Sequence, residues 1–302
     1  MTQHNHRRVA RWAVGLAAVT AATTLGAAIA SGTASATATT GATVSPSAAT
    51  FVVTLSPIQT KGVPTTITPG YHAFVIKTKT ERGLQIVQLL NGYSAKQADK
   101  DIQASFQISG PKDPRLKQWQ RFTKNAHMLG GLQPQPGYFV TGTKFWVNLV
   151  PGTYVAVNTP VNEGKDVLTP FTVSGTATGS KPHAIGLITP HEYGFGVHVT
   201  AGAHLVAIKN TGSQIHMVQV EKLDPGHTEA DFLTALQTGD PNAPPPSWIH
   251  DSGFAGLVSA KQTEYTQMNF TPGNYEIVCF MPDIHKGVPH LFLGMHRFVT
   301  VS

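Results

Sequence analysis

Cysteine is almost absent from this sequence: Cys279 is the single one among 302 residues. One thiol cannot form an internal disulfide, so the fold has to be stabilised by hydrophobic cores instead of cross-links. In an oxidising compartment such a thiol is buried and inert, joined to another chain, or bound to another group. These three possibilities stay open at this point.

Long apolar runs are absent after residue 36, so no later segment is long enough to span a bilayer. Before that point, Arg7, Arg8 and Arg11 precede an Ala-rich apolar run, which ends in the small residues ASA at 34–36. This order predicts a cleaved signal peptide over residues 1–36 and a secreted, extracytoplasmic protein. An uncleaved membrane anchor is the alternative, and Arg7-Arg8 leaves twin-arginine export open beside the general secretory route.

A strong excess of one charge is also absent. The chain has 22 Lys and Arg against 16 Asp and Glu, and three of the Arg lie in residues 1–36, which leaves a net charge of +3 for the remaining 266 residues. This charge is too small to favour nucleic acid or an anionic membrane as a partner. Nor does the sequence contain a nucleophile elbow, a P-loop, a dinucleotide-binding fingerprint or a zinc-protease helix.

The sequence does contain many short runs of Val, Ile, Phe and Tyr, bounded by Gly, Pro and Asn. Examples are YHAFVIK at 71–77, HLVAIKN at 204–210 and YEIVCF at 275–280. Many of these runs alternate with period two, which predicts antiparallel β-sandwiches. By contrast, residues 37–50 are rich in Thr, Ala and Ser without an apolar period, which predicts a flexible tether.

The chain also repeats itself. TPGYHAFVIK from Thr68 matches TAGAHLVAIK from Thr200, and VPGTYVAVN from Val150 matches TPGNYEIVC from Thr271. Each copy has a helical insertion after its second matched strand, and each insertion begins with a capping pattern, Ser94 with Gln97 and Thr228 with Asp231. We therefore expect an all-β chain of two tandem β-sandwich domains, each with a short helical insertion. The predicted ranges are 51–174 for the first domain, 175–189 for a linker and 190–302 for the second domain.

Soft and imidazole side chains gather near the C-terminus. Cys279 ends a predicted strand, His290 follows after ten residues, and Met295 follows after four more. A thiolate, an imidazole and a thioether suit copper better than calcium or magnesium, which prefer oxygen ligands. A trigonal site needs one more imidazole from another strand, and His216 supplies it just after a Gly-containing turn. We predict His216, Cys279 and His290 in the plane and Met295 as a weak axial ligand, which is the blue-copper arrangement. The alternative for Cys279 is a small buried hydrophobic residue.

Residues 190–302 resemble the cupredoxin family of blue-copper proteins. Asn210, Gly212 and His216 resemble the segment that carries the family's first histidine, and the PGxYxxxC run that ends at Cys279 resembles the strand that carries the thiolate. This resemblance implies a Greek-key cupredoxin-like fold, one type 1 copper ion per chain and one-electron transfer with a redox partner, which we expect to dock over the edge of His290. Copper binding without a redox role, and a cell-surface scaffold with a vestigial site, remain alternatives.

Some residues depart from the family. The ten-residue loop after Cys279 resembles the longer ligand loop of copper nitrite reductases, and Met217 stands where many members carry a polar residue that helps hold the site. Multicopper oxidases share a His-Cys-His element, and copper nitrite reductases place a histidine before the cysteine, whereas Val278 and Phe280 flank Cys279 here. We therefore expect a copper protein that is not an enzyme.

The first copy lacks the ligand set. In the alignment of the two copies, Gln85 (or Leu84, if the gap shifts) falls at the position of His216, and Asn158 falls at the position of Cys279. Residues 159–173 then contain neither His nor Met. We therefore expect a first domain that binds no type 1 copper and has a structural or docking role.

Overall fold

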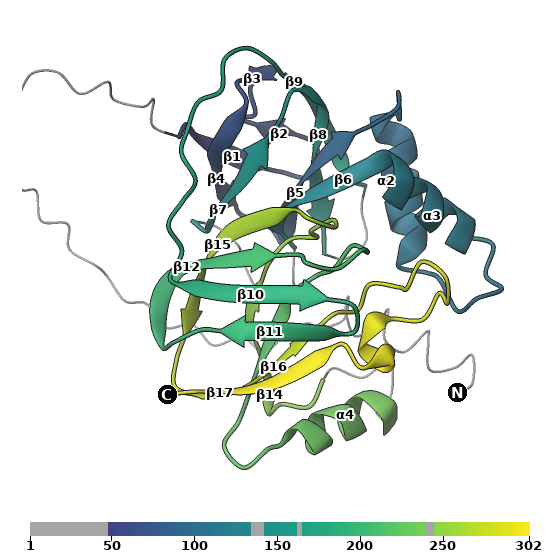
Figure 1. The fold of residues 1–302 in the computed structure, drawn as a ribbon, viewed down its shortest axis with the longest axis vertical. Coiled ribbons are helices and arrows are strands. Elements are labelled where there is room, and N and C mark those ends of the chain that lie inside the picture. The colour runs from purple at the N-terminus through teal and green to yellow at the C-terminus, as the bar shows by residue number, and fades with distance from the viewer. Residues whose placement is uncertain (1–47, 134–141, 162–164, 239–244) are drawn as a thin grey trace, which may run out of the picture.

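The computed structural model describes residues 48–133, 142–161, 165–238 and 245–302. The predicted signal peptide and most of the predicted tether lie outside these ranges. Within them, none of the helices has the length and apolar character needed to cross a membrane. The chain is built mainly of β-strands in three sheets, with a few short helices beside them (Figure 1).

The described residues of the first copy form nine strands and two helices. These are β1 (Thr50–Leu55), β2 (Thr60–Lys61), β3 (Thr66–Ile67), β4 (Gly70–Thr78), β5 (Arg82–Leu89), α2 (Ala95–Ser105), α3 (Leu116–Asn125), β6 (Ala126–Leu132), β7 (Lys144–Leu149), β8 (Gly152–Pro160) and β9 (Val167–Val173). Helix α2 begins at the predicted cap, where the Ser94 side chain accepts a hydrogen bond from the Gln97 amide. Helix α3 was not expected from the sequence.

The second copy repeats most of this order. Its elements are β10 (Gly186–His191), β11 (Gly194–His198), β12 (Gly202–Lys209), β13 (Gln219–Leu223), α4 (Glu229–Thr238), β14 (Ile249–Phe254), β15 (Thr263–Phe270), β16 (Gly273–Val278), the 3-10 helix η1 (His290–Leu293) and β17 (His296–Val301). Strand β10 begins within the range predicted as a linker. The predicted helical insertion is confirmed as α4, and Thr228 and Asp231 make the expected reciprocal hydrogen bonds at its start.

The sheets show the duplication in their strand order. The order β6-β5-β8-β9 in the five-stranded sheet, which β3 completes, corresponds to β14-β13-β16-β17 in the four-stranded sheet. The eight-stranded sheet has the order β11-β10-β12-β15-β7-β4-β1-β2, so one half comes from each copy. The halves join where β15 pairs antiparallel with β7, with Tyr265 opposite Trp146. The two copies therefore share one continuous sheet.

Equivalent tyrosines confirm the repeat in detail. The Tyr154 hydroxyl donates to the Val150 carbonyl at 2.7 Å and accepts from the Val150 amide at 3.1 Å. The Tyr275 hydroxyl makes the same two bonds to Thr271, at 2.7 and 3.0 Å. The predicted fold class, an all-β chain with two sandwich copies and helical insertions, is confirmed.

The strand register corrects one detail of the internal alignment. Tyr154 pairs with Gln88, whereas the equivalent Tyr275 pairs with Lys222. Gln88 and Lys222 are therefore equivalent positions in the two copies. Three residues earlier in each copy, Gln85 is equivalent to Gln219, and three residues before that, Arg82 is equivalent to His216. The expectation that Gln85 or Leu84 takes the place of His216 is wrong, because matching Val-Gln pairs in both copies drew the alignment out of register.

The hydrophobic cores also cross between the copies. One core fills the first sandwich, and a second core runs from α2 and α3 of the first copy to Cys279, Met281 and Met295 of the second copy. Helix α3 contributes Leu116, Trp119 and Phe122 to this shared core, at helical spacing. The predicted site therefore lies where both copies pack together.

Candidate metal centre

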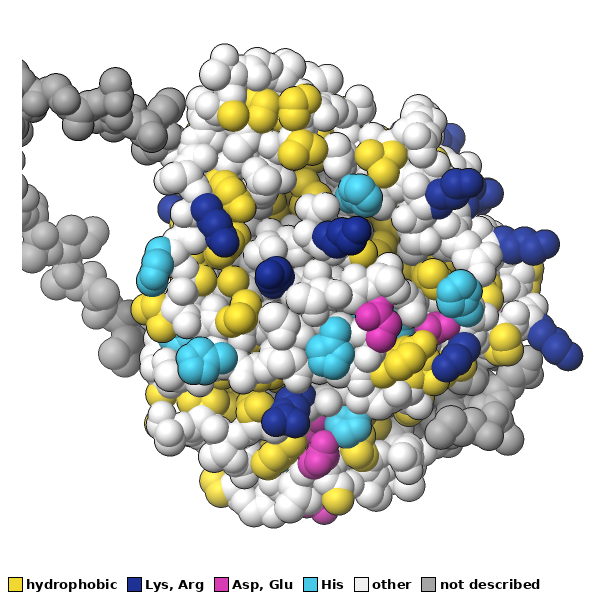
Figure 2. Space-filling view, in the orientation of Figure 1, with side chains coloured by type: hydrophobic (Ala, Val, Ile, Leu, Met, Phe, Trp, Pro, Cys, Tyr) yellow, Lys and Arg dark blue, Asp and Glu magenta, His cyan; other side chains and the backbone are white. Residues whose placement is uncertain are grey.

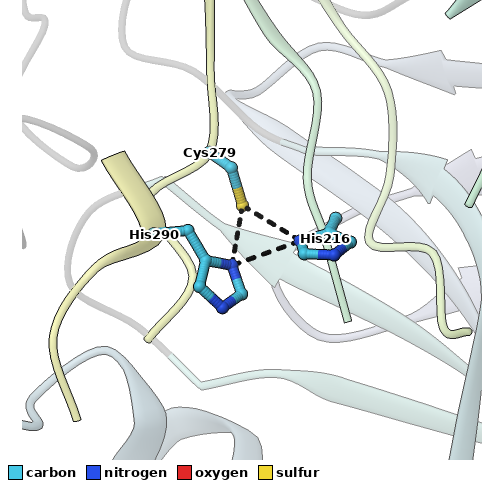
Figure 3. Close-up of side chains that lie close together, drawn as sticks. All are labelled: His216, Cys279 and His290. Atoms are coloured by element: carbon cyan, nitrogen blue, oxygen red, sulfur yellow. Dashed lines mark hydrogen bonds between the residues drawn. The ribbon is translucent and has the colours of Figure 1, made fainter. Parts of the chain in front are cut away.

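Three of the predicted ligands come together from three separate segments (Figure 3). His216 precedes β13 and is held to Val258 by two backbone hydrogen bonds, Cys279 directly follows β16, and His290 begins η1. The two Nδ1 atoms lie 3.2 Å apart, and the Cys279 Sγ lies 3.5 Å from His290 Nδ1 and 3.9 Å from His216 Nδ1. All three side chains are buried, with at most 1 % of any of them exposed.

Met295 is brought to the same region by its backbone. Its amide donates to the His290 carbonyl at 3.0 Å, and its carbonyl accepts from the Cys279 amide at 3.3 Å. Its side chain is fully buried in the hydrophobic core that contains Cys279. Its role as an axial ligand remains a prediction.

The donor set fits a single metal ion. Three ligands in a plane around one ion, with bonds of about 2.0 Å to nitrogen and about 2.3 Å to sulfur, lie roughly 3.4–3.7 Å apart. The three observed separations, from 3.2 to 3.9 Å, bracket this range. Two imidazoles and one thiol suit copper or zinc and do not suit calcium or magnesium.

Without a metal ion, the three groups are neutral at pH 7. Burial, with a smaller effect from neighbouring His290, lowers the pKa of His216 to about 3. Burial also lowers the pKa of His290 to about 4 and raises the pKa of the Cys279 thiol to about 12. A metal ion bound to the thiolate therefore has to displace the thiol proton, whereas both imidazoles are ready to bind.

The asparagine of the Asn-x-Gly motif holds the loop that precedes His216. The Asn210 side chain donates to the Gln214 and Val258 carbonyls at 2.7 and 2.8 Å and accepts from the Gly212 amide at 2.8 Å. It thereby fastens this loop to the segment that pairs with His216. The motif singled out in the sequence thus has a physical purpose, because it sets the position of the first imidazole.

Gln214 orients the second imidazole, a role that sequence analysis did not predict. Its Nε2 donates to Asp283 Oδ2 at 2.8 Å, so its Oε1 faces the site, where it accepts from the Ile284 amide at 2.8 Å and lies 3.3 Å from His290 Nε2. Because this oxygen can only accept, the His290 proton lies on Nε2 and Nδ1 keeps a free lone pair. In the sequence, Gln214 is a polar residue two positions before His216, and no motif distinguishes it.

Asp283 in turn fixes Gln214. Its carboxylate accepts from Tyr193 Oη at 2.7 Å and from the amides of His285 and Lys286 at 2.9 and 2.6 Å. Burial alone raises the pKa of this group, but the hydrogen bonds outweigh burial and lower the pKa to about 2. Asp283 is therefore a stable anion, and it keeps Gln214 in the orientation that His290 needs.

The thiol also receives a hydrogen bond from the backbone. The Met217 amide donates to Cys279 Sγ at 3.5 Å. Met217 was noted in the sequence because it lacks a polar side chain. Its main chain supplies the contact that the side chain cannot.

The first copy holds the ligand loop in place (Figure 1). Trp119 Nε1 of α3 donates to the Pro282 carbonyl at 2.9 Å, and Gln120 Nε2 donates to the Ile284 carbonyl at 2.7 Å. Because the ring of Tyr193 also packs edge-on against His290 and Gln214 covers its Nε2, none of the His290 side chain is exposed. A partner that docks over the edge of His290 would therefore contact the cover formed by Tyr193 and Gln214, and the docking site remains a prediction.

A different pair occupies the equivalent position of the first copy. Arg82 Nε donates to Asn158 Oδ1 at 2.5 Å, and its Nη2 donates to the Asn158 carbonyl at 3.0 Å. The Asn158 amide donates further to Ser56 and Thr60. A guanidinium is always positively charged and offers no lone pair, so this pair repels a metal ion instead of binding one.

Two further histidines lie near the ligands in the sequence. His285 is exposed in the ligand loop, as the sequence suggested. His296 follows Met295, and its side chain contacts Glu229 and Glu276 on the other side of the strand. Neither histidine belongs to the group around Cys279.

Comparisons with known proteins give structural neighbours alone. No family model matches the chain, and no curated protein matches it significantly. One neighbour is a dithionite-reduced auracyanin from Roseiflexus castenholzii, which is 22 % identical over 38 % of this chain and 94 % of that chain, with a TM-score of 0.24. Another is auracyanin A from Chloroflexus aurantiacus, a blue copper protein, which is 21 % identical over 39 % of this chain and 100 % of that chain, with a TM-score of 0.25. A blue copper oxidase from Nitrosomonas europaea is 10 % identical over 84 % of this chain and 86 % of that chain, with a TM-score of 0.21. These scores are too low to carry an argument about the site.

Proposed function

We propose that the chain binds one type 1 copper ion through His216, Cys279 and His290, with Met295 as a weak axial ligand, and that it transfers single electrons. The observation that carries this proposal is the meeting of two imidazole Nδ1 atoms and one thiol Sγ in a buried position. Two histidines, one cysteine and a distant methionine are the ligand set of blue-copper electron-transfer sites.

The residues around the site support this role. Bound copper would supply a one-electron change between Cu(I) and Cu(II). The chain holds the ligands rigidly through Asn210, Gln214 and Asp283, so they need to move little when the charge changes. Met281, which is fully buried in the same core as Cys279, excludes water from the thiolate side.

The proposal assigns different tasks to the two copies. The second copy, a cupredoxin-like domain, carries the ligands, and the first copy supplies helix α3 as a support for the ligand loop. Electrons would pass through the thin cover over His290 that Gln214 and Tyr193 form. A redox partner would therefore dock on the face that contains Tyr193, beside Lys286, whose ammonium lies over the tyrosine ring.

The proposal includes no reaction on a substrate. Val278 and Phe280 flank the thiol, so neither neighbour offers an imidazole that would link Cys279 to a second copper ion. Secretion after removal of residues 1–36 also belongs to the proposal, and N-terminal sequencing of the exported protein tests it.

A visible absorption spectrum of the copper-loaded protein tests the site. With Cu(II), the protein should show the intense blue colour that a copper–thiolate bond produces, and Cys279→Ser should remove it. His285→Ala, which changes an exposed histidine of the same loop, should keep the colour. A colourless wild-type protein, or colour that survives in Cys279→Ser, would contradict the proposal.

Voltammetry separates electron transfer from copper handling. An electron-transfer protein should show a reversible one-electron couple, because its ligands are already in place. A protein that only stores or delivers copper would hold Cu(I) without a reversible couple.

A further inference from the structure

A second group of side chains that could hold a metal ion lies beside β16 and β17, the strands that directly precede Cys279 and directly follow Met295. Nδ1 of His296 lies 3.0 Å from Glu229 Oε1 and 3.2 Å from Glu276 Oε1. One ligand atom from each residue lies within 4.8 Å of the other two. The residues come from three elements: Glu229 begins α4, Glu276 lies in β16 and His296 begins β17.

Glu276 is buried in a way that an ion pair alone does not explain. Its side chain is fully buried, and Oε2 makes no hydrogen bond within the described part of the chain. The backbone amide of Arg297 lies near this carboxylate and favours its charged form. It does not reach hydrogen-bonding geometry at Oε2. A buried carboxylate oxygen without a partner is costly, and a bound cation would satisfy it.

The first copy provides an internal comparison. The strand register places Val155 at the position of Glu276 and Leu168 at the position of His296. Ala95, the first residue of α2 after its capping serine, stands where Glu229 begins α4 after its capping threonine. Val155 belongs to the hydrophobic core that the two copies share, and Ala95 and Leu168 pack against that core. The fold is therefore compatible with three apolar side chains at these positions, whereas the second copy has two carboxylates and an imidazole there.

The geometry points to a divalent transition-metal site. We propose that Glu229, Glu276 and His296 bind a divalent first-row transition-metal ion such as Zn²⁺, at a second site that does not depend on the copper centre. Four ligands around Zn²⁺, with bonds of about 2.0–2.2 Å, lie roughly 3.3–3.5 Å apart. The contacts of 3.0 and 3.2 Å from His296 Nδ1 to the two carboxylates need to open by only a few tenths of an ångström, and the ligand oxygens of the two carboxylates lie within 4.8 Å of each other.

The site also has a path to solvent. The side chains of Glu229 and His296 are 46 % and 20 % exposed. Over β17 and α4, the space-filling view shows an imidazole and acidic side chains side by side at the surface (Figure 2). An ion can therefore enter from water, and a water molecule can complete the three protein ligands, as in other open zinc sites. Calcium and magnesium fit less well because they prefer oxygen ligands alone.

Zn²⁺ titration by calorimetry tests the proposal. The experiment uses the mature chain carrying Cys279→Ser, because this substitution weakens zinc binding at the copper centre. We expect one tight Zn²⁺ per chain. Glu276→Val and His296→Leu, the residues of the first copy, should each weaken binding by about 100-fold or more, because loss of an outer partner alone costs about 10–100-fold. Glu229→Ala should weaken it by about 10-fold.

Two controls keep the outcome clear. His250→Leu changes a histidine that faces a single exposed carboxylate, Asp224, and should leave Zn²⁺ binding unchanged. Glu276→Gln keeps the shape of the side chain and should weaken binding as Glu276→Val does, which guards against a folding defect in the valine variant. Absence of tight Zn²⁺ binding, or binding that Glu276→Gln and His296→Leu leave unchanged, would overturn the proposal and identify the cluster as an ion pair.

Discussion

At the scale of single residues, the proposed ligands are positioned by neighbours that are not part of the ligand set. Asp283 fixes the amide of Gln214, and Gln214 fixes the tautomer of His290. The Met217 amide contributes a hydrogen bond to the thiol through the main chain. These contacts determine where the lone pairs of the ligands point, so they should affect affinity and potential without being ligands.

Gln214→Leu tests this chain of contacts. The variant removes the acceptor for His290 Nε2 and the hydrogen bond that the Gln214 side chain donates to Asp283. Copper affinity should fall by about 10–100-fold, the range for outer partners of metal ligands, while the blue colour of the saturated protein remains. Competition with a chelator measures the affinity, and voltammetry measures the accompanying change in potential.

Gln267→Leu is the matched control, because Gln267 is exposed on β15. Its affinity and potential should equal those of the wild-type protein. If Gln214→Leu also behaved like wild type in both measurements, Gln214 would have no positioning role.

At the scale of elements, the same framework serves two purposes. The register that places Cys279 in the second copy places Asn158 in the first, where Arg82 binds it. The helices differ as well: the first copy has α3 in addition to α2, and α3 carries the contacts to the ligand loop. The pair α2 and α3 must therefore be well anchored if the loop is to stay in place.

An almost fully buried carboxylate anchors these helices. Asp101 of α2 accepts hydrogen bonds from Gln97 at 2.8 Å, from Tyr93, and from two nitrogens of Arg121 of α3 at 2.6 and 2.5 Å. Burial alone raises the pKa of Asp101, but the hydrogen bonds from Arg121, Tyr93 and Gln97 outweigh it and lower the pKa below its ordinary value. Because the folded-state pKa is lowered, the stabilisation is present above the unfolded pKa of about 3.9 and is lost as the pH falls through the folded value.

Asp101→Asn should lower the free energy of unfolding at pH 7 by about 2 kcal/mol, near the lower end for charged hydrogen bonds because the Arg121 side chain is 47 % exposed. The difference between wild type and variant should shrink below about pH 4, because Asp101 of the unfolded chain takes up its proton there while Asp101 of the folded protein, with its lowered pKa, still resists protonation. Denaturant unfolding at several pH values measures both effects. Asp224→Asn, at an exposed pair with His250, should cost less than about 0.5 kcal/mol. An Asp101→Asn difference that stays constant down to pH 2 would contradict the assignment.

At the scale of the whole molecule, we expect the two copies to unfold as one cooperative body. The eight-stranded sheet passes from one copy to the other where β7 pairs with β15, and one hydrophobic core contains both Trp119 and Cys279. Contacts of this extent between the copies should couple the unfolding of the two halves. A ligand that binds the second copy should therefore stabilise the first copy as well.

Calorimetric unfolding with and without copper tests this coupling. We expect a single transition, which moves up by about 5–10 °C at a hundredfold excess of copper over its dissociation constant. The near-ultraviolet signal of Trp119 and Trp146, in the first copy, should move with the same midpoint. Two transitions, of which only one responds to copper, would show that the copies unfold independently.

The sequence by itself determined the features that depend on local pattern. The alternation of Val, Ile and Tyr predicted the strands, the capping residues predicted α2 and α4, and the repeated PG-x-Y runs predicted the duplication that Tyr154 and Tyr275 confirm. The sequence also predicted the candidate ligands, from the spacing of Cys279, His290 and Met295 and from the turn before His216. This was possible because each of them belongs to a short segment with its own motif.

Only the tertiary structure decided the features that depend on contacts between distant segments. The pairing of strands showed that Arg82, and not Gln85, is equivalent to His216 in the other copy. Register depends on the hydrogen bonds to neighbouring strands, which the identity of aligned residues does not report. The docking of α3 fastened the ligand loop at Pro282 and Ile284, and the packing of α4 on β16 and β17 brought Glu229 to Glu276 and His296. Residues such as Gln214 acquire their roles only when the chain folds, because a hydrogen bond depends on direction and distance, which no spacing in the sequence specifies.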